Sequence, residues 1–115
     1  PMSDCLFCKI VNKEIPSNFV YEDDDMVAFN DIRPKAPTHI LLIPKKHIEK
    51  LSDLNSGDAA LAGKMILNIS KIAEQAGIKE NGFRVVVNNG KNSGQEVYHL
   101  HFHILGGKPM SWNPA

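Results

Sequence analysis

This chain lacks both an excess of charge of either sign and a long apolar run. Its 115 residues carry 13 basic and 13 acidic side chains, so the net charge gives no support to broad binding of nucleic acid or acidic membranes. No apolar stretch approaches the length that spans a membrane, and the N-terminal segment has no signal-peptide pattern. We therefore expect a cytoplasmic protein with no nucleic-acid partner and no membrane partner.

Cysteine is also scarce, because Cys5 and Cys8 are the only two. With no distant partner for either thiol, a disulfide framework is excluded, and a reducing compartment is expected. The Cys-x-x-Cys spacing is that of half a tetrahedral zinc site. It is also the spacing of a redox dithiol, although the usual Trp, Gly and Pro context is missing here. Two unlinked thiols are the third interpretation, and the spacing alone leaves all three open.

The order of apolar segments predicts a single α+β domain over residues 2–115, with residues 108–115 as a C-terminal tail. A mainly antiparallel five-stranded sheet would carry a short N-terminal helix and one long helix. The expected strands are 19–21, 26–29, 39–43, 83–87 and 98–105, and the short helix is 4–12. The long helix would start at Asn55 or Ser56 and end at Gly77.

The long helix has an unusually broad apolar surface. An apolar stripe at spacings of three and four predicts the face that packs on the sheet. Ala62, Ile66 and Ala73 widen that stripe. The helix would then face either a second apolar surface, such as a partner subunit, or simply be well buried.

Three of the five histidines, His99, His101 and His103, alternate within five residues. On a strand they would share one face, while Leu100 and Phe102 fill the other. Imidazole is the side chain best suited to proton transfer, metal ligation or nucleophilic attack near neutral pH. This row therefore marks the candidate functional site.

Three interpretations of the row compete. The histidines could be hydrogen-bonded residues of a half-buried strand. A His-x-His pair, such as His101 and His103, could hold a catalytic metal, although His99 and His103 lie about 13 Å apart along a strand and would not share one ion. Finally, a neutral imidazole could attack an electrophile while its neighbours move protons.

The preceding loop favours phosphorus chemistry. Gly90 and Gly94 let the backbone approach a ligand closely, and exposed N–H groups there can bind phosphate oxygens. The Gly-Lys-Ser/Thr ending of a P-loop is absent, and such a loop is by itself also compatible with a flexible connection.

The segment His99-Leu100-His101-Phe102-His103-Ile104-Leu105 matches the signature of the histidine triad (HIT) superfamily. The flanking segments resemble its Hint branch over nearly the whole chain. These segments are Ile15-Pro16, Phe29-Asn30-Asp31-Ile32, Ala36-Pro37-Thr38-His39, Ile43-Pro44-Lys45-Lys46-His47-Ile48, Gly94-Gln95-Glu96-Val97-Tyr98-His99 and Leu105-Gly106-Gly107.

The resemblance implies a homodimer with a continuous ten-stranded sheet that hydrolyses purine nucleoside phosphoramidates and related acyl-nucleotides to a nucleoside monophosphate. The alternative is a purine-nucleotide-binding regulatory or scaffold protein with incidental hydrolase activity. Carried over by position, His101 would be the nucleophile and form a nucleotidyl-histidine, and His103, His39, His99 and Glu96 would complete the catalytic group.

The resemblance also implies a binding site for the nucleotide and no organic cofactor. Asp31 would bind the ribose. Phosphate oxygens would be held by Asn88, Gly94, Gln95 and Val97 beside His101 and His103, and the base would lie against Phe7, Phe29 and Ile32, with Leu6 and Ile10 as further candidates. Without the resemblance, Asp31 would be interpreted as a turn residue and both phenylalanines as core.

A structural zinc is implied for relatives with Cys-x-x-Cys at this place, and its ligands here would be Cys5, Cys8, His47 and His99. Glu96 stands where many animal relatives have Ser, so the role of that Ser in helping the leaving group does not transfer. Asn30 replaces a frequent His. Trp112, in the tail, would lie near the partner's active site and tune substrate selection.

Overall fold

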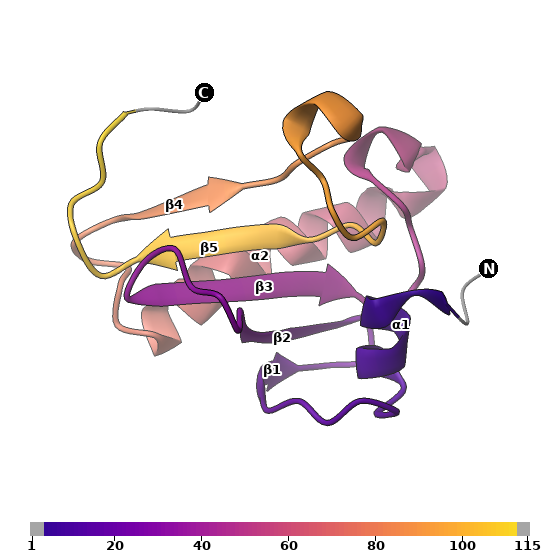
Figure 1. Cartoon of the computed structure of the whole chain (residues 1–115), viewed down its shortest axis with the longest axis horizontal. Coiled ribbons are helices and arrows are strands. Elements are labelled where there is room, and N and C mark those ends of the chain that lie inside the picture. Colours follow the sequence, from indigo (N-terminus) through magenta and orange to yellow (C-terminus); the bar gives the residue numbers. More distant parts are fainter. Residues whose placement is uncertain (1–3, 113–115) are drawn as a thin grey trace.

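The computed structural model describes residues 4–112, which form one sheet and two α-helices. The elements in chain order are α1 (Leu6–Val11), β1 (Phe19–Glu22), β2 (Met26–Asn30), β3 (Thr38–Pro44), α2 (Ala59–Gln75), β4 (Phe83–Val86) and β5 (Phe102–Gly106). The strands lie in the order β1-β2-β3-β5-β4, and each neighbouring pair is antiparallel (Figure 1). The predicted α+β class is confirmed.

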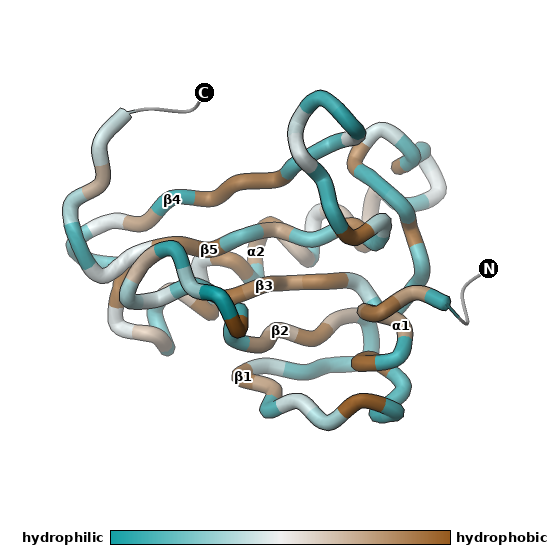
Figure 2. The backbone as a smooth tube through the Cα atoms, in the orientation of Figure 1, coloured by the Kyte–Doolittle hydropathy of each residue, from teal (hydrophilic) through white to brown (hydrophobic). Residues whose placement is uncertain are grey.

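The sheet is covered on both faces. α2 packs behind it and the much shorter α1 lies in front, at the end where β3 finishes (Figure 1). Apolar residues concentrate on the central strands, and the loops are mainly hydrophilic (Figure 2). Leu42 and Ile104 belong to the core on the α2 side, whereas Leu41 and Ile43 pack with Phe7 on the α1 side. The continuous apolar character of β3 therefore reflects burial on both faces.

The residues predicted to mark the two ends of the long helix do so in the structure. The Asn55 side chain accepts from the Gly57 backbone and forms a capping box with Asp58, which begins a 3-10 turn that leads into α2. Gly77 follows the helix with a φ of 78°, a left-handed conformation that glycine adopts without strain. Met65, Ile69 and Ile72 are buried against the sheet, whereas Ile66 on the flank is 56% exposed.

The fifth strand is shorter than predicted. The sequence predicts 98–105, but β5 begins at Phe102, so His99 and His101 precede it. The reason is that β3 ends at Pro44, which has no N–H to extend the ladder, and the Leu100 N–H bonds the carbonyl of Ile48 instead. The other strand boundaries agree with the prediction to within one residue, and α1 is shorter than the predicted 4–12.

Strand register places two histidines on the α1 face. His39 is paired with Leu105, and His103 is paired with Leu41, so His39 and His103 are diagonal neighbours on adjacent strands. Within residues 4–112, no helix combines the length and the apolar character that crossing a membrane requires.

Candidate functional site

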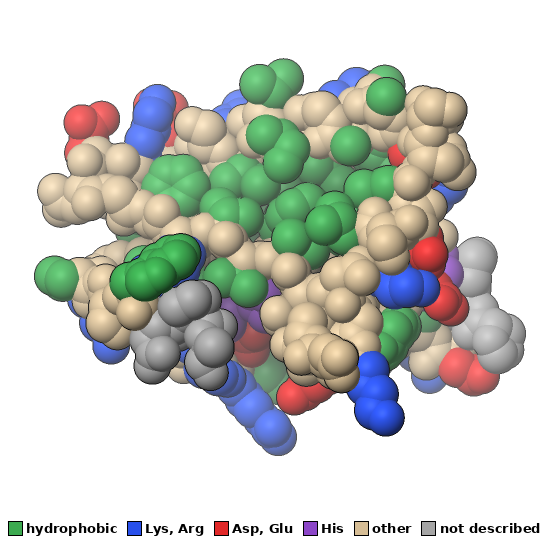
Figure 3. Space-filling view, turned by 90° about the horizontal axis from the view of Figure 1, so that it is seen from above, with side chains coloured by type: hydrophobic (Ala, Val, Ile, Leu, Met, Phe, Trp, Pro, Cys, Tyr) green, Lys and Arg blue, Asp and Glu red, His purple; other side chains and the backbone are tan. Residues whose placement is uncertain are grey.

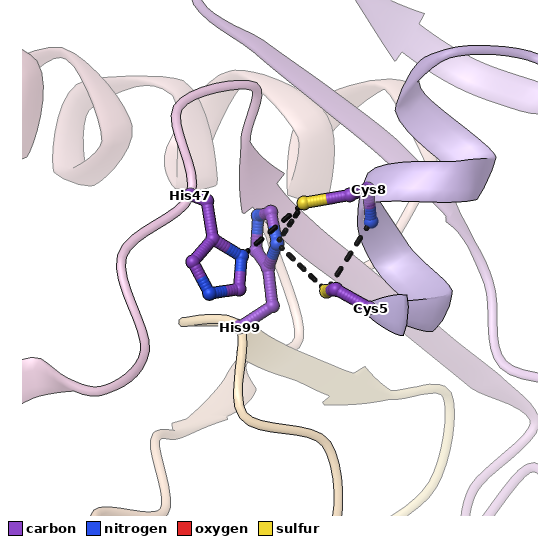
Figure 4. A group of neighbouring side chains, drawn as sticks. All are labelled: Cys5, Cys8, His47 and His99. Atoms are coloured by element: carbon purple, nitrogen blue, oxygen red, sulfur yellow. Dashed lines mark hydrogen bonds between the residues drawn. The ribbon is translucent and has the colours of Figure 1, made fainter. Parts of the chain in front are cut away.

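Four soft donor atoms converge where α1 meets the end of β3. Cys5 caps the start of α1, Cys8 lies within it, His47 follows β3 and His99 precedes β5 (Figure 4). The Cys8 Sγ lies 3.2 Å from His47 Nδ1 and 3.5 Å from His99 Nδ1, and Cys5 Sγ lies 3.4 Å from His99 Nδ1. One ligand atom from each residue lies within 4.8 Å of all the others. The predicted ligand set is thus brought together from three distant parts of the chain.

The protonation of His99 fits a metal ligand. Its Nε2 lies 2.7 Å from the Pro44 carbonyl, which can only accept, so Nε2 carries the proton and the Nδ1 lone pair faces the thiols. A carbonyl that fixes the tautomer of a metal-binding imidazole is a typical outer-sphere partner. Burial lowers the pKa of His99 to about 4, so the ring is neutral at pH 7. Two thiols and two imidazoles form the Cys₂His₂ set that tetrahedral zinc prefers.

His101 is oriented by the same residue. Its Nδ1 lies 2.7 Å from the backbone carbonyl of His99, so Nδ1 donates and the Nε2 lone pair is free for chemistry. The His101 ring is buried, and burial lowers its pKa. The Phe7 ring stands edge-on to it at 5.1 Å, and the His103 ring lies 5.0 Å away. This arrangement presents a neutral nucleophilic nitrogen in a water-poor setting.

A chain of hydrogen bonds fixes the tautomers of His39 and His103. The Lys35 N–H donates to His39 Nδ1 at 3.0 Å, so the neutral His39 ring carries its proton on Nε2. That nitrogen lies 2.8 Å from His103 Nδ1 and donates to it, which leaves the proton of His103 on its own Nε2. Burial, with a smaller contribution from His101, lowers the pKa of His103 to about 4. His103 is thus a proton donor beside the free nitrogen of His101.

Asp31, His39 and His103 also have donor atoms within 4.8 Å of one another. The chemistry of this second group does not fit a metal ion. A metal on His39 Nε2 would force the ring proton onto Nδ1, against the Lys35 N–H that now donates there. The Asp31 carboxylate instead lies 3.5 Å from His39 Nε2, where it favours a positive charge on that ring.

The residues expected to bind the nucleoside differ in exposure. Phe7 and Phe29 are buried with ring centroids 5.6 Å apart. Ile32 is 93% exposed and free to cover a ligand. Asp31 accepts from the Arg33 N–H and faces His39.

The loop expected to bind phosphate is held in place by a buried amide. Gly90 and Gly94 both have positive φ, at the two ends of a 3-10 turn. The Gln95 Oε1 accepts from the Gly90 N–H, and its Nε2 donates to the carbonyls of Glu49 and Val97. Gln95 therefore shapes this loop in the structure.

Two further candidates, Glu96 and Trp112, lie outside the histidine group. Glu96 is exposed and lines a pocket of about 480 Å³ together with Cys5 and His47. These two residues belong, with Cys8 and His99, to the group that could hold a metal ion, here called the metal-binding cluster. Trp112 lies over the Arg84 guanidinium at 5.7 Å, and Arg84 donates to the Ser111 carbonyl at 3.0 Å. The tail thus contacts β4 of its own chain.

Sequence reasoning missed two backbone groups that set the chemistry. The Pro44 carbonyl and the Lys35 N–H decide which nitrogen of His99 and of His39 is protonated. No pattern of side chains in the sequence predicts the roles of these two groups. The Ile43-Pro44 segment was the nearest signal, since a strand that ends at proline leaves its final carbonyl available.

Comparisons with known proteins agree with this geometry. Residues 12–110 match the HIT domain. The chain belongs to the HIT family. The Escherichia coli K12 purine nucleoside phosphoramidase is 49% identical over 107 residues, which cover 93% of this chain and 90% of the relative. An uncharacterised HIT-like protein of Synechocystis is 50% identical over 112 residues, or 97% of both chains.

Solved structures show the same fold in this family. The crystal structure of a HIT family hydrolase from Legionella pneumophila has a TM-score of 0.94 at 49% identity and covers 97% of this chain and 100% of that one. A histidine triad protein from Clostridium difficile has a TM-score of 0.90 at 51% identity and covers 94% of each chain. The family model begins after Cys5 and Cys8, so the metal-binding cluster is supported by its own geometry.

The cluster geometry predicts one tightly bound zinc ion per chain, measured by elemental analysis after dialysis against a weak chelator. The Cys8→Ser variant should lose the zinc, because it removes a buried thiolate ligand. The matched His103→Asn variant changes a half-buried histidine outside the cluster and should retain it. A wild-type chain that takes up no zinc, or a Cys8→Ser variant that still binds it stoichiometrically, would contradict the assignment.

Proposed function

We propose that this protein hydrolyses the P–N bond of purine nucleoside 5′-phosphoramidates, and of related acyl-nucleotides, to a nucleoside monophosphate. The coarser expectation, a nucleotide hydrolase of the HIT family, is confirmed by the family match and the named relatives. One observation carries the finer proposal. The His99 carbonyl holds the proton of His101 on Nδ1, which leaves its Nε2 unprotonated, and the neighbouring His103 ring holds its own proton on Nε2. A cytoplasmic location is part of the same proposal.

The first step is attack by His101. Its Nε2 lone pair forms a bond to the α-phosphorus while the bond from phosphorus to the amine nitrogen breaks. The His99 carbonyl stabilises the positive charge that develops on the ring, because Nδ1–H donates to it. The product of this step is a nucleotidyl-histidine and a free amine.

The departing amine nitrogen needs a proton, and His103 holds one on Nε2. Burial keeps His103 neutral in the free protein, so an anionic phosphoryl group would bring one proton into the histidine cluster as it binds. That proton is shared along His103 and His39, next to the Asp31 carboxylate, and passes from His103 Nε2 to the amine. Water then attacks phosphorus and gives one proton to His103 Nε2, which is open after the amine has left, while the bond to His101 breaks and the monophosphate leaves.

The rest of the site would hold the nucleotide. The base would pack on Phe7 and Phe29, with Ile32 closing over it, and Asp31 would accept from the ribose hydroxyls. The phosphoryl oxygens would meet Asn88, the backbone near Gly94 and Val97, and the loop that Gln95 shapes. Glu96 would act on the leaving-group side. The metal-binding cluster would hold a structural zinc, and the only group of the cluster that the reaction uses is the backbone carbonyl of His99.

Replacing the proposed nucleophile gives the direct test. The His101→Ala variant should lose at least about a thousandfold in kcat for an adenosine phosphoramidate, while AMP binding stays within about tenfold of wild type. Wild-type protein quenched during turnover should carry AMP on His101, as read by peptide mass spectrometry.

Other outcomes separate the alternatives. Turnover by folded His101→Ala, or turnover of the wild type with no nucleotide adduct, would contradict the mechanism. AMP binding with negligible steady-state turnover would favour a regulatory or scaffold protein. Turnover that persists in metal-depleted protein that remains folded would rule out metal-dependent hydrolysis.

We also propose that two chains join through β4 into a continuous ten-stranded sheet. β1 and β4 are the two edge strands. The β1 edge carries Glu22, which pairs with Lys45 at 3.1 Å, and charge protects an edge from pairing. The β4 edge presents Val85, and the nearby flank of α2 presents Ile66. Figure 3 views the molecule from that side and shows hydrophobic side chains gathered into one patch. In such a dimer, Trp112 would tune substrate selection.

The two edge strands offer a matched test of this dimer. Val85 on β4 and Val20 on β1 are similarly exposed, at 39% and 42%. Val85→Glu should convert the dimer to monomer in sedimentation analysis, because it buries a charge at the interface, and Val20→Glu should leave the dimer intact. A wild-type monomer at micromolar concentration would contradict the proposal, as would a dimeric Val85→Glu variant.

A further inference from the structure

Phe7 lies between the metal-binding cluster and the reaction site. It belongs to α1, flanked in sequence by Cys5 and Cys8. Its ring is buried and contacts three other rings edge-on, those of His101 at 5.1 Å, His99 at 6.0 Å and Phe29 at 5.6 Å. Anything that fixes α1 therefore also fixes the ring against which His101 is oriented.

His99 links the metal-binding cluster to His101 a second time, because its ring and its backbone carbonyl belong to one residue. Its ring Nδ1 faces both thiols, while its own backbone carbonyl accepts from His101 Nδ1. The His99 side chain is fully buried, and its Nε2 is held by the Pro44 carbonyl. A shift of this ring toward or away from a metal would move the carbonyl that sets the orientation of His101.

α1 is held by the apolar packing of Phe7 and Ile10 and by these polar contacts. It spans six residues, fewer than an isolated helix needs to be stable in water. Its side-chain hydrogen bonds to His47 and His99 are sulfur–nitrogen contacts of 3.2–3.5 Å, which are weak compared with metal–thiolate and metal–imidazole bonds. An ion in the cluster would therefore hold α1 much more firmly than the thiols do alone.

We infer that zinc binding at the cluster and nucleotide binding at His101 strengthen each other, with Phe7 and His99 carrying the coupling. The inference rests on the proposed nucleotide site. Zinc orders α1 and so prepares the Phe7 wall of the base pocket, and a base packed on Phe7 in turn holds the ligands Cys5 and Cys8 in place. The three ligands Cys5, Cys8 and His99 are then positioning residues for the reaction as well as metal ligands.

Thermodynamic linkage makes this testable without measuring activity. If AMP raises the zinc affinity by some factor, zinc must raise the AMP affinity by the same factor. We expect saturating AMP to raise the affinity of the protein for zinc at least about fivefold, as measured by equilibrium competition between the zinc-loaded protein and a chromogenic chelator. AMP titration of zinc-loaded and zinc-depleted protein by calorimetry should give the same factor.

Two phenylalanine variants separate coupling from general packing. Phe7→Leu keeps an apolar side chain but removes the ring, and should reduce the factor clearly below that of the wild type, leaving the part that His99 carries. Phe19→Leu changes a partly buried ring packed on the same core cluster, away from the histidines, and should leave the factor unchanged.

The failures are distinct. A factor of one in wild-type protein that binds both zinc and AMP would overturn the coupling and leave the proposed function standing, as would a Phe7→Leu variant that retains the wild-type factor. Absence of AMP binding would overturn the coupling and the proposed function together, and absence of zinc binding would overturn the coupling alone.

Discussion

The site depends on one buried residue, His99, whose two ring nitrogens and backbone carbonyl all have partners at once. Its ring donates to the Pro44 carbonyl, its other ring nitrogen faces two thiols, and its backbone carbonyl accepts from His101. A fully buried imidazole can persist only when its polar atoms are paired. Because these partners come from β3, α1 and the segment before β5, satisfying His99 fixes the relative position of all three.

The protonation pattern of the histidines follows from backbone groups that can act only as acceptors or only as donors. Carbonyls at Pro44 and His99 can only accept, and the Lys35 N–H can only donate. These three backbone groups give neighbouring imidazoles opposite tautomers, so the free lone pair of His101 lies beside a ring, His103, that holds its proton on Nε2. Burial lowers the pKa of both rings, so they are neutral and hold these tautomers before any substrate binds.

Much of the fold could be predicted from the sequence because its signals are local. The α2 stripe, the Asn55 cap and Gly77 depend on residues within a few positions of one another. The extent of β5 could not be predicted, because the alternation of His99 to His103 continues past the point where Pro44 ends the pairing on the adjacent strand. Alternation still told correctly which side chains enter the core, since Leu100 and Phe102 pack there.

The candidate site divides in the same way. The Cys-x-x-Cys spacing indicated half of a zinc site, the family resemblance added His47 and His99, and the fold brings the four residues together. The division of roles among the histidines could be taken only from the family resemblance, since it depends on backbone groups that have no signature in the sequence. The exposure of Ile32 and the hydrogen bonds of the Gln95 amide within its own loop could likewise be known only from the structure.

The central claim is that backbone hydrogen bonds hold the imidazoles of His101 and His103 in opposite tautomers. Long-range ¹H–¹⁵N correlation spectra of the imidazole rings at neutral pH measure this directly. The account predicts that the proton of His101 is on Nδ1, with Nε2 unprotonated, and that the proton of His103 is on Nε2. A His101 ring with its proton on Nε2 would contradict it.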